Sequence, residues 1–123
     1  MSNSLDPIGV FDSGVGGITV LKRLVNKLPG ENYLYFGDTA RIPYGEKTKE
    51  QLIVFVKDIL DWYKLNNVKA VFMACNTSSA VVLDEIEKDY NFPIFGIIKP
   101  TAEFICQLEA KIIGIIATSA TIK

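Results

Sequence analysis

The stretch "AVFMACNTSSAVV", residues 70–82, changes from an apolar run to small polar residues at a cysteine. A short apolar run predicts a strand buried on both faces, and the polar residues after it predict the turn into a helix. Cys75 then stands at the carboxyl end of the strand, where open α/β sheets bind ligands. The chain has no histidine and one other cysteine, Cys106, so the role of Cys75 must be explained without an imidazole partner.

The same alternation of apolar runs and helical patterns continues along the whole chain. Strands are predicted at five apolar runs: 8–11, 33–36, 70–74, 94–98 and 112–116. Amphipathic helices are predicted between them, over about 18–28, 52–63, 81–88 and 101–109. Such alternation predicts an α/β fold, with a mainly parallel, doubly wound sheet and helices on both faces.

Composition excludes several classes of protein. A chain of 123 residues is about one domain, and a net charge of −1 gives no basic surface for nucleic acid. The start lacks the order of a signal peptide, and no apolar run approaches the ~20 residues of a membrane helix. Two distant cysteines form neither a disulfide framework nor a zinc site, and a metal site with histidine is excluded. We therefore expect a cytoplasmic protein with no nucleic-acid, membrane or metal partner.

The residues that follow the five predicted strands share a small, polar or ionisable character. They are Asp12-Ser13-Gly14, Gly37-Asp38-Thr39, Cys75-Asn76-Thr77, Lys99-Pro100-Thr101 and Thr118-Ser119-Ala120-Thr121. Because the carboxyl ends of parallel strands meet at one edge of a sheet, these residues should converge. Five such ends on one rim predict a site for a small polar molecule.

The stretch "FDSGVGGITV", residues 11–20, is a glycine turn between a strand and a helix. Its spacing is neither G-x-G-x-x-G nor a phosphate loop, so a nucleotide site is disfavoured. Glycines here can take positive φ or allow a ligand close to the backbone. A tight turn with Asp12 or Ser13 as a helix cap would also explain the glycines, although not the need for both polar residues.

The stretch "GDTARIPYGEK", residues 37–47, is longer than most connections between a strand and a helix. Pro43 and Gly45 bend the chain around Tyr44, and backbone N–H groups there could hold a carboxylate. A plain surface loop with Arg41 and Tyr44 in solvent is the alternative, and the loop alone slightly favours it.

The two cysteines have different settings. Most free cysteines are small buried hydrophobes, but Cys75 lies at a strand end and at the mouth of a helix, which stabilises a thiolate. A nearby Asp12 carboxylate would oppose that effect, and such a balance suits a group that takes and gives protons. Cys106 lies in a predicted helix beside Ala102 and Ile105, so we expect it to pack in the core.

Acid–base chemistry by the thiol is what remains for Cys75 once a histidine-assisted nucleophile and a metal site are set aside. Asp12 could pair with the ammonium of a substrate. Groups able to hold its carboxylates are the backbone near Tyr44 and Gly45 and the residues Asn76, Thr77, Thr118 and Thr121. This set suits an amino acid, and with no cofactor motif present the expected reaction is proton transfer at its α-carbon.

Four blocks of the sequence resemble the glutamate racemase family in order and spacing. They are "IGVFDSGVGGITVL", "YFGDTARIPYG", "MACNTSSA" and "GIIATSATIK". The resemblance implies cofactor-independent interconversion of L- and D-glutamate, which supplies D-glutamate for peptidoglycan. It also implies two cysteines on opposite faces of the substrate, one removing the α-proton and the other returning a proton.

The resemblance assigns roles to residues that match the family's motifs. Cys75 and Asp12 would be catalytic, Asp12 by assisting the thiol or holding the ammonium. The residues that would contact substrate are Asp12, Ser13, Pro43, Tyr44, Gly45, Asn76, Thr77, Thr118 and Thr121. The family's second cysteine and a histidine lie in a later block that this sequence does not contain, and the helical setting of Cys106 makes it an unsuitable replacement.

Residues 1–123 are therefore expected to form the N-terminal lobe of a two-lobe racemase, with the chain continuing past Lys123. The alternative is a non-catalytic truncated lobe, or an amino-acid-binding module. The full-length protein could form a homodimer, although the sequence does not specify an oligomeric state.

Overall fold

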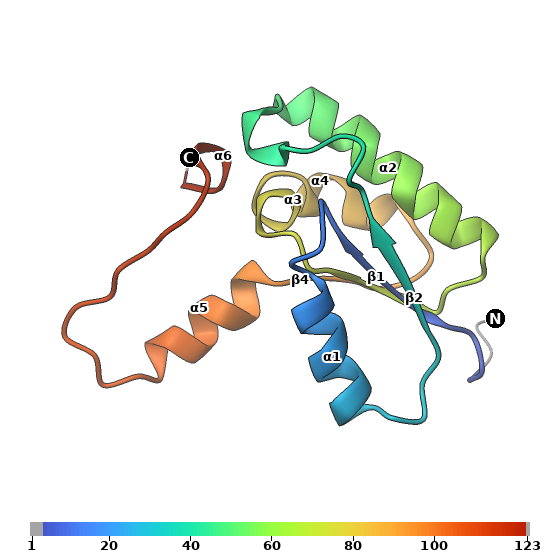
Figure 1. Cartoon of the computed structure of the whole chain (residues 1–123), viewed down its shortest axis with the longest axis horizontal. Helices are drawn as coiled ribbons and strands as arrows, with labels where there is room; N and C mark the ends of the chain where they lie inside the picture. Colours follow the sequence, from blue (N-terminus) through green and yellow to red (C-terminus); the bar gives the residue numbers. More distant parts are fainter. Residues whose placement is uncertain (1–3, 123) are drawn as a thin grey trace.

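The computed structural model describes residues 4–122, and it contains a four-stranded, fully parallel sheet (Figure 1). The strands are β1 (Ile8–Asp12), β2 (Tyr33–Gly37), β3 (Ala70–Met73) and β4 (Ile94–Gly96). Their order in the sheet is β2-β1-β3-β4, so β1 and β3 are the central pair. The α/β fold with a parallel sheet is confirmed.

The strands form where apolar residues run continuously because both faces of the sheet are covered. Every residue of β1 is buried, as expected for the centre of such a sheet. In the register Val10 pairs with Tyr35 of β2 on one side and with Phe72 of β3 on the other. This register brings the carboxyl ends of β1 and β3 to the same level.

Helix α1 (Ile18–Lys27) covers one face of the sheet. Its apolar stripe packs against β1 and the residue after β3; the contacting side chains are Val20, Leu21 and Leu24 on the helix and Ile8, Val10 and Ala74 beneath it. The predicted apolar stripe is confirmed at Leu21 and Leu24, whose spacing of three residues places them on one helical face. It is wrong for the other three positions, which are 42–49% exposed because the face that meets the sheet is turned toward Val20: Ile18, Val25 and Leu28.

Helix α2 (Lys49–Leu65) lies on the opposite face, so helices cover both faces as predicted. Its core positions are Leu52, Val56, Ile59, Leu60 and Tyr63, all fully or almost fully buried. The helix begins at a capping box, in which the Thr48 hydroxyl accepts from the Gln51 N–H and the Gln51 side chain accepts from the Thr48 N–H. This cap fixes where the loop after β2 ends.

The predicted helix over 81–88 is wrong in its bounds. The chain instead forms three short pieces: α3 (Asn76–Val81), α4 (Leu83–Ile86) and the 3₁₀ turn η2 (Glu87–Asp89). The break falls at Val82, whose φ of −119° departs from helical geometry while its side chain is buried in the core. Adjacent β-branched residues, Val81 and Val82, are poor helix formers, so core packing decides the geometry there.

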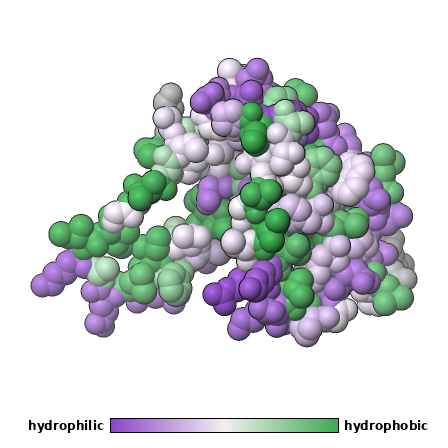
Figure 2. Space-filling view, in the orientation of Figure 1, coloured by the Kyte–Doolittle hydropathy of each residue, from purple (hydrophilic) through white to green (hydrophobic). Residues whose placement is uncertain are grey.

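The predicted fifth strand at 112–116 does not form in the described chain. Helix α5 (Ile98–Cys106) leads away from the sheet, and an extended segment returns to α6 (Ser119–Ile122) beside α3 (Figure 1). Ile112 is 92% exposed, and Figure 2 shows hydrophobic residues gathered along this segment. A parallel strand needs hydrogen bonds from a neighbouring strand, and α5 carries this segment away from both sheet edges.

Candidate functional site

The candidate site lies where the strand order reverses. The chain crosses from β1 to β2 on one side and later to β3 on the other side of β1, which makes the β1–β3 junction the switch point of the sheet. Ligands of open α/β sheets bind outside the carboxyl ends of the strands at such a point. Asp12 ends β1 and Cys75 follows β3, and the Ala74 N–H donates to the Phe11 carbonyl at 2.9 Å between them.

The Asp12 carboxylate closes the glycine turn that follows β1. Its Oδ2 accepts the N–H groups of Gly14 at 3.1 Å and Gly17 at 3.0 Å. The carboxylate therefore holds the turn, but the predicted helix cap at Asp12 or Ser13 is wrong, because α1 begins after Gly17 and has no side-chain cap. The glycines of the described chain do not have positive φ, so the left-handed geometry that we considered for this turn is wrong. Gly17 is needed instead for space, since a Cβ there would lie 2.5 Å from the Asp12 Cβ.

Cys75 occupies the N-cap position of α3 in an extended conformation, and it is only 4% exposed. It belongs to the same buried hydrophobic cluster as Tyr44, which comes from the loop after β2. Asn76 and Thr77 begin α3, with Asn76 exposed and Thr77 buried. The cysteine therefore lies at the boundary between the apolar core and the polar rim.

Three threonine hydroxyls join α6 to this rim. Thr118 Oγ1 lies 3.0 Å from Thr77 Oγ1 and 2.9 Å from Thr121 Oγ1, and the Thr121 hydroxyl donates to Thr77 Oγ1 at 3.4 Å. Thr118 also caps α6, because its Oγ1 accepts the Thr121 N–H at 3.3 Å. The sequence pattern that places a threonine and a serine after residues 112–116 is typical of a helix start, and α6 does begin at Ser119, although the strand expected before it is absent from the described chain.

These groups line one open pocket of about 420 Å³. Its lining residues are Asp12, Ser13, Cys75, Asn76, Thr77, Ile98, Thr101, Ile115, Ile116, Ala117, Thr118 and Thr121. All the predicted site residues except those of the 43–45 loop therefore come together here. Thr101 of α5 also reaches this pocket, whereas Lys99 and Pro100 line a different one beside Phe95.

The loop residues Pro43, Tyr44 and Gly45 lie beside this pocket but do not line it. Gly45 is so close to Thr118 that a Cβ at residue 45 would lie 2.8 Å from the Thr118 Cβ. Pro43 is exposed, whereas the Tyr44 ring is buried, so the alternative with Tyr44 in solvent is wrong. Burial and then a hydrogen bond to Asp38 raise the pKa of the Tyr44 hydroxyl, and negative charge on Cys75 acts in the same direction.

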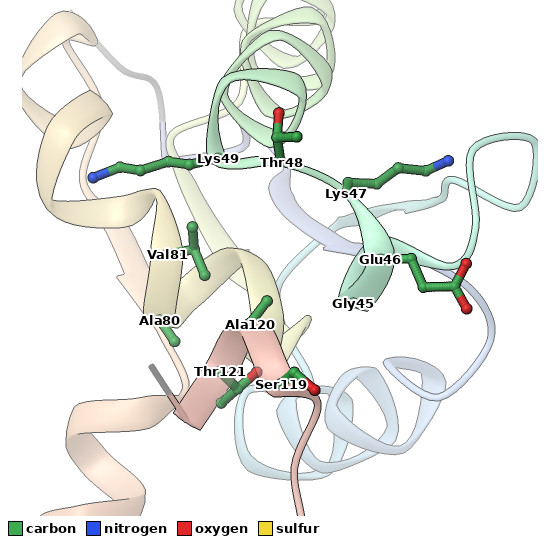
Figure 3. A pocket seen from close by; sticks show the side chains of 10 residues that line it. All are labelled: Gly45, Glu46, Lys47, Thr48, Lys49, Ala80, Val81, Ser119, Ala120 and Thr121. Carbon is green, nitrogen blue, oxygen red and sulfur yellow. The ribbon is translucent and has the colours of Figure 1, made fainter.

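A second pocket, of about 550 Å³, opens between this loop and α6 (Figure 3). Its two lysines, Lys47 and Lys49, point in opposite directions away from its centre in Figure 3. Lys49 is also paired with Glu85. Neither lysine ammonium therefore points into this pocket, and we place the candidate chemistry in the pocket with Cys75.

Asp38 belongs to one of the five predicted strand ends, although the sequence assigned it no catalytic or binding role. It follows β2, is 5% exposed, and accepts hydrogen bonds from Arg41 Nε at 2.6 Å and from the Tyr44 hydroxyl. The sequence shows only an aspartate directly after an apolar run, with an arginine three residues later, and this pattern does not reveal the burial of Asp38.

Cys106 is exposed at the end of α5, so the prediction that it packs in the core is wrong. Within the described part of the chain, α5 has no buried residues because neither helix nor sheet covers its apolar side. Residues 4–122 contain no cluster of three or more potential metal-binding acids or cysteines. No helix among them is long and apolar enough to cross a bilayer.

Comparisons with known proteins identify relatives of this chain. It is 55% identical over 117 residues to the glutamate racemase of Trichormus variabilis and 52% identical over 117 residues to that of Rippkaea orientalis. Each match covers 95% of this chain but only 40% or 41% of the relative. The chain therefore spans about 40% of the length of the curated relatives that it matches.

Solved structures show the same likeness in three dimensions. The glutamate racemase of Thermus thermophilus, solved with β-chloro-D-alanine, is 44% identical to this chain, with a TM-score of 0.89. The match covers 98% of this chain and 46% of the Thermus chain. The glutamate racemase of Francisella tularensis, solved with D-glutamate, is 40% identical to this chain, with a TM-score of 0.87. The match covers 98% of this chain and 45% of the Francisella chain.

Fold and site together define an open parallel α/β domain with a small-molecule pocket at its switch point. Residues 8–123 match the model of the Asp/Glu/Hydantoin racemase family. The chain belongs to this racemase family, and the resemblance seen in its motifs is confirmed.

Proposed function

We propose that this chain forms the N-terminal lobe of a glutamate racemase, in which Cys75 exchanges a proton with the α-carbon of glutamate. The observation that carries the proposal is the position of Cys75, a buried thiol facing a pocket with Asp12 and three threonine hydroxyls. Its relatives support glutamate as the substrate, since the Francisella enzyme was solved with D-glutamate.

The proposed binding mode uses charge and hydrogen bonds already present around the pocket. Asp12 attracts the substrate ammonium, while the Thr77, Thr118 and Thr121 hydroxyls hold carboxylate oxygens. Ser13 and Asn76 complete the polar lining, and Pro43, Tyr44 and Gly45 approach from the loop. A volume of 420 Å³ lies within the range of roughly 300–1,000 Å³ for small-molecule sites.

The proposed reaction breaks the α-C–H bond and forms an S–H bond at Cys75. The electron pair left on the α-carbon is delocalised into the adjacent carboxylate, and proton return restores the C–H bond. Return from the same thiol regenerates the same enantiomer, because the proton arrives on the face from which it left. Inversion needs a second acid–base group on the opposite face, which we assign to a second lobe.

The wider role follows from the same family resemblance. D-Glutamate made by a cofactor-independent racemase supplies peptidoglycan synthesis, and we assign that role in the cytoplasm to the whole protein.

The test uses the two cysteines as a matched pair. The chain, Cys75→Ser and Cys106→Ala are each incubated with L-glutamate in deuterium oxide. α-Proton exchange is followed by NMR, and inversion is followed by optical rotation. We expect exchange without inversion for the chain and for Cys106→Ala, and loss of exchange for Cys75→Ser.

Two outcomes would contradict the proposal. If Cys75→Ser exchanges the α-proton as fast as the unchanged chain does, the Cys75 thiol does not carry the proton transfer. Full racemisation by Cys106→Ala would show that one thiol suffices and would rule out the two-lobe account. Binding of glutamate without exchange would favour the alternative of a non-catalytic amino-acid-binding module.

A further inference from the structure

We propose that Asp38 is a positioning residue, which holds the 39–47 loop against the pocket through the Tyr44 hydroxyl. The inference rests on the proposed function, because it assigns to Asp38 the task of keeping that pocket ready for substrate. The Asp38 carboxylate bonds to residues of the loop, and we assign it no contact with the reacting atoms.

Asp38 is anchored at its backbone and buried at its side chain. Its N–H donates to the Asp12 carbonyl at 2.9 Å, which extends the β1–β2 ladder by one residue. Its carboxylate is 5% exposed, so the charge has little water and depends on the loop for its partners. Those partners are Arg41 Nε at 2.6 Å and the Tyr44 hydroxyl, both bonded to Oδ2.

The loop is thereby tied back onto the residue from which it starts. Arg41 lies three residues and Tyr44 six residues after Asp38. The loop therefore folds back so that both side chains reach the same carboxylate oxygen. The Arg41 guanidinium also lies 4.6 Å from the centre of the Phe55 ring on α2. The Tyr44 ring lies 5.9 Å from the same ring. Helix α2 therefore provides the surface on which this folded loop rests.

From Tyr44 a short chain of contacts leads to the pocket. The next residue, Gly45, leaves no room for a Cβ against Thr118. Thr118 in turn is hydrogen-bonded to Thr77, beside Cys75. A change in the position of Tyr44 must therefore move Gly45 relative to the threonine hydroxyls that we assign to the substrate carboxylates.

A purely stabilising ion-pair network is the competing explanation. Arg41 also pairs with Asp58 of α2 at 2.8 Å, but Asp58 is 62% exposed and has no contact with Tyr44 among the described hydrogen bonds. Exposed ion pairs contribute little to stability. Asp58 is therefore a matched control, since it shares Arg41 with Asp38 but not the connection to the pocket.

The size of the effect follows from the strength of the lost hydrogen bond. A hydrogen bond to a charged group changes an equilibrium constant by roughly 10- to 100-fold. If the loop leaves its position in some molecules, the apparent affinity for substrate is the intrinsic affinity multiplied by the fraction of molecules whose loop is still in place. We expect Asp38→Asn and Tyr44→Phe each to weaken glutamate binding by about 10-fold or more, on that basis.

The experiment measures glutamate affinity and loop position separately by NMR on the intact chain. Affinity comes from titration with L-glutamate, and loop position from the nuclear Overhauser contact between Gly45 and Thr118 in the free protein. Asp38→Asn and Tyr44→Phe should lose both, and the double variant should bind no more weakly than the worse single variant. Asp58→Asn should keep the contact and bind within about two-fold of the native chain.

Tyr44→Phe keeps the Asp38–Arg41 pair and the ring packing, so it tests the proposal even if Asp38→Asn fails to fold. Retention of the Gly45–Thr118 contact and of native affinity in Tyr44→Phe would overturn the positioning role. Equal losses in Asp58→Asn would also overturn it in favour of the ion-pair network. The contact is measured without substrate, so absence of glutamate binding by the native chain would overturn the proposed function while the contact still decides the role of Asp38.

Discussion

Replacement of Gly17 by alanine tests whether the turn after β1 is held by close packing. Gly17 has φ −63° and ψ −13°, values that alanine adopts readily. An added Cβ, however, would lie 2.5 Å from the Asp12 Cβ and 3.0 Å from the Ala74 Cβ. Both neighbours are attached directly to strand backbones and cannot rotate away. The turn must therefore move by about 1 Å to reach ordinary contact distances.

The expected cost combines three effects. Alanine in place of glycine gains roughly 0.5–1 kcal/mol from the unfolded chain. Overpacking costs about 1–3 kcal/mol. Displacement of the Gly17 N–H from the Asp12 carboxylate, now 3.0 Å away, sacrifices part of a charged hydrogen bond worth roughly 1.5–3 kcal/mol. The net loss of unfolding free energy is then about 2–4 kcal/mol, or roughly 10 °C in Tm for a domain of this size.

Urea unfolding and thermal melts followed by circular dichroism measure this loss. Gly30→Ala is the matched control, because the exposed Gly30 has open space where a Cβ would be added. We expect Gly30→Ala to change stability by less than about 0.5 kcal/mol. If Gly17→Ala is as stable as Gly30→Ala, close packing does not hold the turn and the argument for the position of Asp12 fails.

Three further predictions concern the core, the tyrosines and the thiols. Leu60→Ala, at a fully buried position of α2, should lose about 2–5 kcal/mol of unfolding free energy in urea titrations, whereas Leu65→Ala, 83% exposed on the same helix, should stay within about 0.5 kcal/mol. Burial raises the pKa of Tyr63 above its ordinary 10.0, so stability should be level below pH 10 and fall above it, and Tyr63→Phe should make that fall shallower in pH-dependent melts. An aromatic-disulfide thiol reagent should label the exposed Cys106 quickly and the buried Cys75 slowly, and equal rates would contradict the burial of Cys75.

The four strands of the sheet could be predicted because their apolar runs are continuous and their partners lie within the described chain. The run at 112–116 carries the same local signal, yet it forms no strand there. The local sequence indicates a preference for extended backbone. Whether a strand forms also depends on which segments lie beside it and can share backbone hydrogen bonds. Helix α5 shows the same limit at its start. The helix predicted over about 101–109 instead spans Ile98–Cys106, and Pro100 is compatible with that earlier start because it lies in the first turn, where its missing N–H costs no hydrogen bond.

The candidate site was predicted more completely than the loop that supports it. Residues directly after β1 and β3 converge because parallel topology requires it, and this rule placed Asp12 and Cys75 together. The inward position of Tyr44 could not be predicted in the same way. It depends on a buried carboxylate, Asp38, bonding to residues three and six positions later, and no periodic pattern reports such a contact.

The glycine turn left two explanations open at Asp12, a structural role in the turn or a contact with substrate, and the geometry makes them compatible. The N–H groups of Gly14 and Gly17 both reach the same carboxylate oxygen, Oδ2. They hold the group in one orientation on the wall of the pocket that Cys75 shares. A carboxylate that must face an ammonium benefits from being fixed before the substrate arrives, because no ordering cost is then added at binding. The turn therefore orients Asp12 for the pocket, and the close packing at Gly17 is what keeps it there.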